Sequence, residues 1–373
     1  MTRFLDHFVM ASARFEAARS VDTPGVLPEN HPCKRLHGHS FWASCMQRLK
    51  NDVNGFEHHV LYQELSKKIE SMNYSHLNEF MSIPTDENLA RYIYEHINDA
   101  SVSTIGLQST KDQGIHLENK DNIHLWKRYQ FEAAHQLPNV KPGHKCGRMH
   151  GHSFQVILHA RTSIESKSIS IDYDEIDRIW NPIHQEVNYK CLNDINGLQN
   201  PTSELLAKWI WDKVKPTLSE LSCVSVYETR SCGAHYNGDD FTIWKDFSFD
   251  SAVKFPKSTT LLNKKTDLEF IHGHTYLLRL NLSAPLNPIM GWTKDFGDVK
   301  EIFSPIFKEI DHRPLYENAD IKNPTLINIG NFILKKVRIK IPEISGLELY
   351  EKEGIGIILK DSQTGPLLPL TQT

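Results

Sequence analysis

The sequence predicts an α+β protein made of three tandem copies of one domain, each an antiparallel four-stranded sheet with two helices on one face. The main observation is a His-Gly-His phrase that occurs three times, followed each time by a small hydroxyl residue and an aromatic residue. It reads RLHGHSF at 35–41, RMHGHSF at 148–154 and FIHGHTY at 270–276. A related phrase precedes each one, and a Pro-Thr phrase with an apolar helical pattern follows it, which divides the chain into 1–120, 121–242 and 243–373.

The middle copy opens with two predicted strands. Residues 129–135 (YQFEAAH) form the first one. Residues 152–162 (HSFQVILHART) form the second, because apolar and polar residues alternate there at a period of two. The residues on one face of this strand are His150, His152, Phe154, Val156 and Leu158.

Two predicted helices and a closing strand complete the copy. Residues 172–187 and 203–214 each carry apolar side chains at helical spacing, and Thr202 or Ser203 is placed to cap the second helix. Residues 221–230 (LSCVSVYETR) read as a strand. The order strand, strand, helix, helix, strand, strand therefore favours a sheet with both helices on the same face.

Composition and charge exclude several classes of protein. A length of 373 residues suits two or three domains, and the net charge of −4 comes without any Lys/Arg-rich run of the kind that binds nucleic acid. No apolar stretch reaches the length of a membrane span, and charged residues interrupt the N-terminal segment where a signal peptide would be apolar. We therefore expect a cytoplasmic protein without a nucleic-acid or membrane partner. The six cysteines follow no disulfide spacing, and most of them are expected to be free thiols.

The histidines of the middle copy indicate a metal site. His150 and His152 share one face of a strand, and His135 ends the neighbouring strand, so three imidazoles with an open fourth position are available for a catalytic Zn²⁺. The alternative is three strand histidines paired with ordinary neighbours, and the repeated pattern favours the metal. Cys146 lies in the turn before this strand, where a nearby divalent cation would partly deprotonate its thiol, so that it could act as a base. Glu228 on an apolar strand faces either solvent or a ligand.

The combined motif FEAAH, KCGRMHGHSF, NPTSE and VYETR resembles the family of 6-carboxy-5,6,7,8-tetrahydropterin synthase and 6-pyruvoyltetrahydropterin synthase, which has the tunnelling fold. The resemblance covers nearly the whole middle copy, and weaker versions cover the other two. It implies Zn²⁺ on His135, His150 and His152, Cys146 as proton acceptor, an Asp-His proton relay, and a glutamate that anchors the pterin. The spacing from Cys146 to the His-Gly-His phrase resembles the carboxy-forming type. The substrate of that type is 7,8-dihydroneopterin triphosphate, and its product leads to 7-deazaguanine and queuosine.

Neither the middle nor the third copy keeps the full set of motif residues. The middle copy has Asn188 and Tyr189 where the resemblance implies the relay pair. The third copy has Asp311 and His312 at those positions but Val253 in place of the first zinc histidine. The losses are complementary, which favours a site shared between two copies.

We therefore expect one composite active site between the middle and third copies, because the family's sites lie between neighbouring domains. In this site Cys146 and the three zinc histidines would face Asp311 and His312. Glu228 and Glu351 both match the pterin-anchoring position, and the sequence leaves open which of them faces the pocket.

The first copy departs furthest from the motif. Arg19 replaces the first zinc histidine and Ser109 replaces the glutamate, although Cys33, His37 and His39 remain. We expect this copy to be a scaffold domain, with a weak second metal site as the alternative. The resemblance implies that the three copies close a pseudo-trimeric β-barrel, which also removes exposed sheet edges. It further allows two such chains to stack head to head as a homodimer.

The sequence thus predicts a zinc-dependent lyase that acts on a small pterin triphosphate. Two alternatives stay open: an enzyme of the same fold that makes the 6-pyruvoyl product or performs only aldol cleavage or epimerisation, and a non-catalytic pterin-binding protein. A zinc hydrolase is a third alternative, and it leaves Cys146 without a role.

Overall fold

The computed structural model describes residues 5–49, 55–97, 101–163, 171–255, 271–321, 323–361 and 366–368. Each copy contributes two α-helices and five strands, one of which has only two residues. The first copy contains β1 (Asp6–Arg19), β2 (His37–Arg48), α1 (Glu57–Glu70), β3 (Ser75–His76), α2 (Asp86–His96), β4 (Val102–Thr110) and β5 (Gln113–Glu118). The middle copy contains β6 (Asn122–His135), β7 (His150–Ser163), α3 (Tyr173–Val187), β8 (Lys190–Cys191), α4 (Ser203–Val214), β9 (Leu221–Thr229) and β10 (Cys232–Tyr236). The third copy contains β11 (Phe241–Val253), β12 (His272–Ser283), α5 (Phe296–Ile310), β13 (Arg313–Pro314), α6 (Leu326–Lys340), β14 (Ile344–Lys352) and β15 (Ile355–Lys360).

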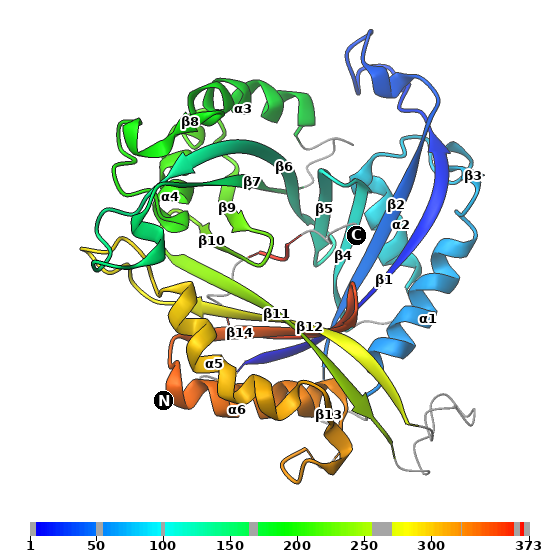
Figure 1. The fold of residues 1–373 in the computed structure, drawn as a ribbon. Coiled ribbons are helices and arrows are strands. Elements are labelled where there is room, and N and C mark those ends of the chain that lie inside the picture. Colours follow the sequence, from blue (N-terminus) through cyan, green and yellow to red (C-terminus); the bar gives the residue numbers. More distant parts are fainter. Residues whose placement is uncertain are drawn as a thin grey trace.

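All the strands belong to one sheet that closes on itself (Figure 1). Copies are joined by antiparallel pairing of β5 with β6, of β10 with β11, and of β15 with β1. We call these junctions the first–middle, the middle–third and the third–first seam. The result is a closed twelve-stranded antiparallel barrel of three repeats, which confirms the predicted fold class.

The helices lie on the outside of the barrel (Figure 1), and the main core fills the space beneath them. On β7, Phe154, Val156 and Leu158 point into this core, as the alternation in the sequence predicted. The Pro-Thr phrase caps the second helix of the middle copy, where the Thr202 side chain accepts a hydrogen bond from the Leu205 N–H at 3.2 Å. Thr85 caps α2 in the same way.

The inner face of the barrel carries two apolar patches. The first consists of Phe8, Met10, Met46 and Ile358, and the second of Trp126, Ile157, Tyr227 and Trp244. Residues 366–368, near the C-terminus, connect the two patches, because Leu367 packs on the first and Leu368 on the second. This segment therefore contacts strands from all three copies inside the lumen.

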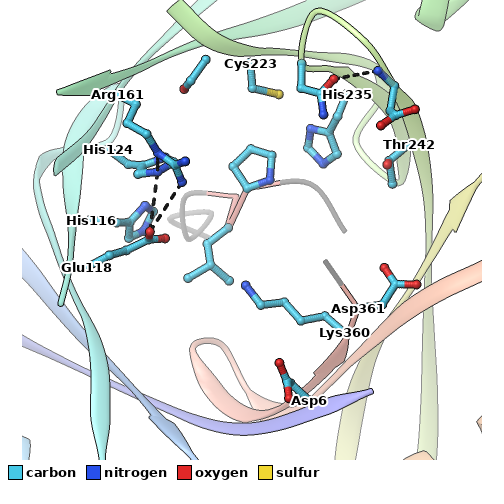
Figure 2. A pocket seen from close by; sticks show the side chains of 15 residues that line it. Asp6, His116, Glu118, His124, Arg161, Cys223, His235, Thr242, Lys360 and Asp361 are labelled. Carbon is cyan, nitrogen blue, oxygen red and sulfur yellow. Dashed lines mark hydrogen bonds and ion pairs between the residues drawn. The ribbon is translucent and has the colours of Figure 1, made fainter. Parts of the chain in front are cut away.

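A polar cavity of about 410 Å³ lies beside this segment. Figure 2 shows His116, Glu118, His124 and Arg161 on one side of it and Lys360 on another. Burial lowers the pKa of both His116 and His124 to about 4, so these imidazoles are neutral at neutral pH. Arg161 Nε donates to His124 Nε2 at 2.5 Å, which requires the neutral imidazole.

Among the described residues, no helix combines the length and the apolar character that crossing a bilayer requires.

Replacing Leu367 and Leu368 by alanine should lower the free energy of unfolding by roughly 1–3 kcal/mol for each leucine, since each side chain loses apolar contacts inside the lumen. Urea unfolding followed by circular dichroism measures this. Leu36→Ala is the matched control, because Leu36 is 66% exposed and its replacement should change stability by less than about 0.5 kcal/mol. Equal stability of the double variant and the control would show that the segment does not tie the copies together.

Candidate active site at the seam between the middle and third copies

Three histidines of the middle copy meet where β6 ends and β7 begins. His135 is the last residue of β6 and pairs across the ladder with His150, the first residue of β7, while His152 pairs with Ala133. The ring centroids of His135 and His150 lie 4.6 Å apart, and those of His135 and His152 lie 5.1 Å apart. Strand register therefore brings together the three side chains that the sequence predicted as metal ligands.

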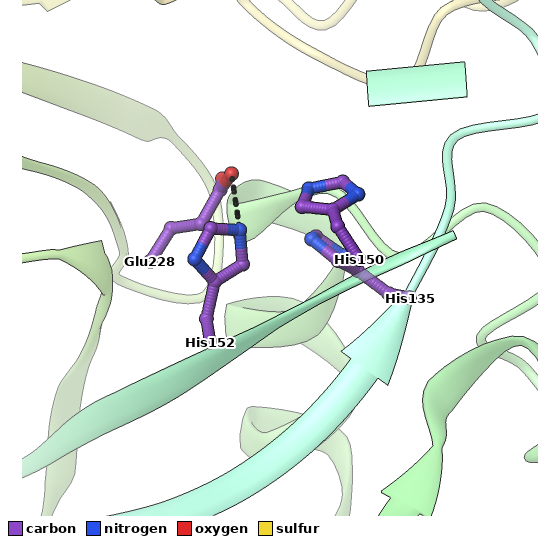
Figure 3. A group of neighbouring side chains, drawn as sticks. All are labelled: His135, His150, His152 and Glu228. Atoms are coloured by element: carbon purple, nitrogen blue, oxygen red, sulfur yellow. Dashed lines mark ion pairs between the residues drawn. The ribbon is translucent and has the colours of Figure 1, made fainter. Parts of the chain in front are cut away.

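Glu228, on β9, completes the cluster (Figure 3). Its Oε1 lies 3.5 Å from His152 Nε2, and Ser203 Oγ donates a hydrogen bond to its Oε2 at 2.8 Å. One ligand atom from each of the four residues, His135, His150, His152 and Glu228, lies within 4.8 Å of all the others. This spacing is suitable for one bound cation.

The protonation of the histidines fits metal binding. His135 Nδ1 lies 3.0 Å from the Pro201 carbonyl and His150 Nδ1 lies 2.7 Å from the Arg148 carbonyl. A carbonyl only accepts, so each Nδ1 carries the proton and each Nε2 keeps its lone pair for a metal. His135 is fully buried, and its Nε2 has no hydrogen-bond partner. Burial lowers the pKa of His135, which keeps the ring neutral.

Cys146 lies on a one-turn 3₁₀ helix (Lys145–Gly147) that precedes β7. The backbone N–H of Cys146 donates to His144 Nδ1 at 3.2 Å, which caps this turn. Cys146 lines the same pocket as His150, His152 and Glu228, a pocket of about 620 Å³. Burial raises the pKa of the Cys146 thiol, and the charge of Glu228 raises it further. The thiol therefore depends on a nearby positive charge to ionise at neutral pH.

The third copy forms the opposite wall of this pocket. Trp292, Lys294, Asp295, Phe296 and Gly297 line it, just before and at the start of α5. Hydrogen bonds hold the wall in place across the seam: Thr202 Oγ1 donates to the Gly291 carbonyl at 2.6 Å. His144 Nε2 also lies 3.0 Å from Asp295 Oδ2. Two copies therefore build one pocket at this seam.

Glu204 is a pocket residue to which the sequence analysis gave no role. It is only 2% exposed, and its Oε1 accepts a hydrogen bond from the Thr293 N–H of the third copy at 2.7 Å. Burial raises the pKa of Glu204 to about 7. The phrase NPTSE contains this residue, but its burial depends on the third-copy loop, which carries no motif.

Asp311 and His312 do not line the pocket of Cys146, contrary to the expected composite site. His312 lines a different recess, together with His272 and His274 of its own copy. The cause is β13, which pairs in parallel with Ser251 and Ala252 of β11, so that the relay pair stays beside its own copy. His312 Nδ1 lies 3.0 Å from Asp311 Oδ2, and the His312 side chain is 77% exposed.

The structure separates the two glutamates that the sequence left as alternatives. Glu228 lies in the middle–third pocket. Glu351 lies at the third–first seam, 3.5 Å from His58 and from His59 of the first copy.

The first copy has an ion pair at the position of the histidine cluster. Arg19, at the position that His135 has in the middle copy, donates to Asp86 Oδ1 at 2.7 Å, and Ser109 Oγ donates to Asp86 Oδ2 at 2.8 Å. A second guanidinium nitrogen of Arg19 lies 3.2 Å from His39 Nε2. The Nε2 lone pair of His39 therefore faces the Arg19 guanidinium and is not available to a metal ion. This favours the interpretation of the first copy as a scaffold over a second metal site.

A family model described as 6-pyruvoyl tetrahydropterin synthase matches three stretches of the chain, residues 9–118, 124–239 and 242–361. These stretches cover most of the sequence and coincide with the three repeats of the barrel. The chain belongs to the 6-pyruvoyl tetrahydropterin synthase family. Membership of this family indicates an enzyme of the tetrahydropterin synthase type that acts in pterin metabolism. The described residues also contain groups that could hold a metal ion.

Similar proteins in this family match about one copy. A 6-carboxy-5,6,7,8-tetrahydropterin synthase of Synechocystis is 34% identical over 119 residues, which is 30% of this chain and 91% of that protein. A dihydroneopterin monophosphate aldolase of Pyrococcus furiosus is 31% identical over 100 residues, which is 26% of this chain and 84% of that protein. Among solved structures, the Caenorhabditis elegans 6-pyruvoyl tetrahydropterin synthase is 21% identical, with 29% of this chain and 90% of that chain covered and a TM-score of 0.28.

Replacing Arg19 by methionine should lower the free energy of unfolding by about 3–5 kcal/mol. The reason is that the Asp86 side chain is only 4% exposed and would lose its buried counter-charge. Adding Asp86→Asn should recover part of this loss. Urea unfolding gives both values. Arg48→Met is the matched control: the Arg48–Asp6 pair is more than half exposed, and its loss should cost no more than about 1 kcal/mol. Equal losses for the two arginine variants would contradict the assigned role of Arg19.

Proposed function

We propose that the chain is a zinc-dependent 6-carboxy-5,6,7,8-tetrahydropterin synthase that acts on 7,8-dihydroneopterin triphosphate in a 7-deazaguanine type of pathway. The active site is the pocket at the middle–third seam. The observation that carries the proposal is the set of His135, His150, His152 and Glu228 in one pocket with Cys146. The similarity of one copy to the Synechocystis 6-carboxytetrahydropterin synthase supports the product.

His135, His150 and His152 would hold the ion through their Nε2 atoms, since carbonyls occupy Nδ1 of two of these rings. Zinc bound there would supply a Lewis acid for the side-chain oxygens of the substrate. Cys146 lines the same pocket and is the group placed to accept a proton from the substrate side chain. A cation beside the thiol offsets the burial that raises its pKa.

The pterin ring and the triphosphate would bind to different parts of the pocket. One carboxylate oxygen of Glu228 accepts a hydrogen bond from Ser203. The carboxylate can also accept hydrogen bonds from the 2-amino group and the ring N–H of a pterin. Lysines and an arginine from both copies also line the pocket and suit a triphosphate: Lys145, Arg148, Lys245, Lys294 and Lys300.

An aldolase is the second candidate function. The Pyrococcus relative, named as a dihydroneopterin monophosphate aldolase, is nearly as similar to this chain as the Synechocystis synthase. Mass spectrometry of the products separates the candidates. A 6-carboxytetrahydropterin with acetaldehyde supports the synthase, a 6-pyruvoyl product supports the pyruvoyl type, and a hydroxymethyl pterin supports an aldolase. Substrate that binds without turnover would indicate a pterin-binding protein.

Cys146→Ser should lower turnover of 7,8-dihydroneopterin triphosphate by about 10²-fold or more while zinc content stays unchanged, because the variant loses the proton acceptor and keeps the histidines. Product formation is followed by mass spectrometry and zinc by elemental analysis. Cys33→Ser is the matched control: Cys33 occupies the same capped 3₁₀ turn in the first copy and should be dispensable. Full activity of Cys146→Ser would contradict the assigned proton acceptor.

We propose further that Asp311 and His312 act on the pocket of a second chain. β6 and β11 run in the same direction around the barrel, because an even number of antiparallel steps separates them. His135 at the end of β6 and His312 beside the end of β11 therefore lie at the same end of the barrel. A second chain stacked on this end would bring its exposed His312 to the pocket that lacks a relay.

Co-expression of Cys146→Ser and His312→Ala chains tests this arrangement. Each variant alone should lose activity, whereas the mixed dimer should have about half of the wild-type activity, because one of its two sites combines an intact Cys146 with an intact His312. Turnover of purified mixed dimers, selected by two different tags, measures the recovery. No recovery would rule out a relay in trans, and a fully active His312→Ala chain would rule out the relay role itself.

A further inference from the structure

A second cluster of metal-ligand side chains lies at the third–first seam. His58 and His59, in the first turn of α1, approach Glu351 on β14 of the third copy. His58 Nε2 lies 3.5 Å from Glu351 Oε2, and His59 Nε2 lies 3.5 Å from Glu351 Oε1. His274 of the third copy lies 3.8 Å from the same carboxylate. Two copies thus contribute histidines to one buried glutamate.

Backbone geometry holds α1 against the third copy. Gly55 has a φ of 91°, and a Cβ at this position would lie 2.5 Å from Thr325 Cγ2. Only glycine allows both this conformation and this close approach. The first turn of α1 therefore starts directly at the seam, with His58 and His59 next to Glu351.

The cluster is buried, and its polar atoms are not satisfied by short hydrogen bonds. The side chains of His58 and Glu351 are 3% and 7% exposed. His58 Nε2 is buried without a hydrogen-bond partner. The two contacts of 3.5 Å are longer than the 2.7–2.9 Å that is typical of a charge-assisted N–H···O bond. The imidazoles therefore surround the carboxylate without forming short hydrogen bonds to it.

These separations match the ligand spacing of a bound transition metal. Bonds of about 2.0–2.1 Å to nitrogen and oxygen place neighbouring ligands of a tetrahedral ion about 3.3 Å apart. One ligand atom each from His58, His59 and Glu351 lies within 4.8 Å of the other two. Neutral imidazoles and a carboxylate are ligands that Zn²⁺ accepts.

This set differs from the histidine cluster of the middle copy. There, three histidines of one copy meet at the end of one strand pair. In the third copy Val253 pairs with His272, so that arrangement cannot form. At this seam the additional histidines come instead from a helix of the neighbouring copy.

We propose that the third–first seam binds a divalent transition-metal ion through His58, His59 and Glu351. The ion joins α1 of the first copy to β14 of the third copy. Its role is structural, because its ligands come from two copies and it stabilises the closure of the barrel beside the β15–β1 pairing. The inference does not rest on the proposed synthase activity.

Metal content after dialysis against zinc and then buffer tests this site. The wild-type chain should hold two zinc ions. His59→Ala and Glu351→Gln should each hold one, and His150→Ala/His152→Ala should also hold one. His59 is chosen because it is 35% exposed and its loss leaves the core intact. His96→Ala is the control and should hold two, since His96 is exposed on α2.

A second readout is independent of activity. Zinc added to the chelator-treated His150→Ala/His152→Ala chain should raise its melting temperature by several degrees, and the addition of His59→Ala should abolish that shift. One zinc ion in the wild type, lost in the His150/His152 variant and kept in His59→Ala, would overturn the seam site and leave the synthase proposal intact. One ion lost only with His59 or Glu351 would support the seam site and contradict the zinc centre of the synthase.

Discussion

The structure depends on closure of the barrel through three seams between copies. Each copy alone is an open four-stranded sheet whose edge strands would expose unpaired backbone groups. Pairing of β5 with β6, of β10 with β11, and of β15 with β1 satisfies these edges in the part of the chain that the structure describes. The same pairing brings the first helix of one copy against the strand ends of the previous copy. The pocket at the middle–third seam and the histidine–glutamate cluster at the third–first seam therefore contain residues from two copies.

The sequence predicted the features that depend on local patterns. Alternation along β7, helical spacing in α3 and α4, and the Pro-Thr cap at Thr202 all appear in the structure as expected. The His-Gly-His phrase predicted that His150 and His152 share a face, and the strand register adds His135. These predictions work because each depends on neighbouring residues or on one antiparallel ladder.

Features that depend on contacts between copies could not be predicted from local sequence patterns. The third-copy wall around Trp292 and the burial of Glu204 follow from a loop without a motif. The position of Asp311 and His312 follows from β13, a two-residue parallel pairing that leaves no periodic signal. His58 and His59 belong to an ordinary amphipathic helix, and only the close approach at Gly55 brings them to Glu351.

Each copy has a carboxylate with compensating groups near its seam, although the residues that provide them differ. A buried carboxylate needs a compensating cation or hydrogen bonds, because burying it unpaired is costly. In the middle copy the carboxylate is Glu228 on the strand, and Ser203 on the helix donates to it. In the first copy the positions are exchanged: Asp86 on the helix is the carboxylate and Ser109 on the strand donates.

The compensating positive charge changes in the same way. Arg19 replaces His135, so a fixed guanidinium stands where the middle copy offers nitrogen ligands, and the charge of Asp86 is balanced without any ion. At the third–first seam, Glu351 keeps the strand position and is surrounded by imidazoles from two copies. At each of these positions the carboxylate and the groups that compensate it therefore differ together from copy to copy.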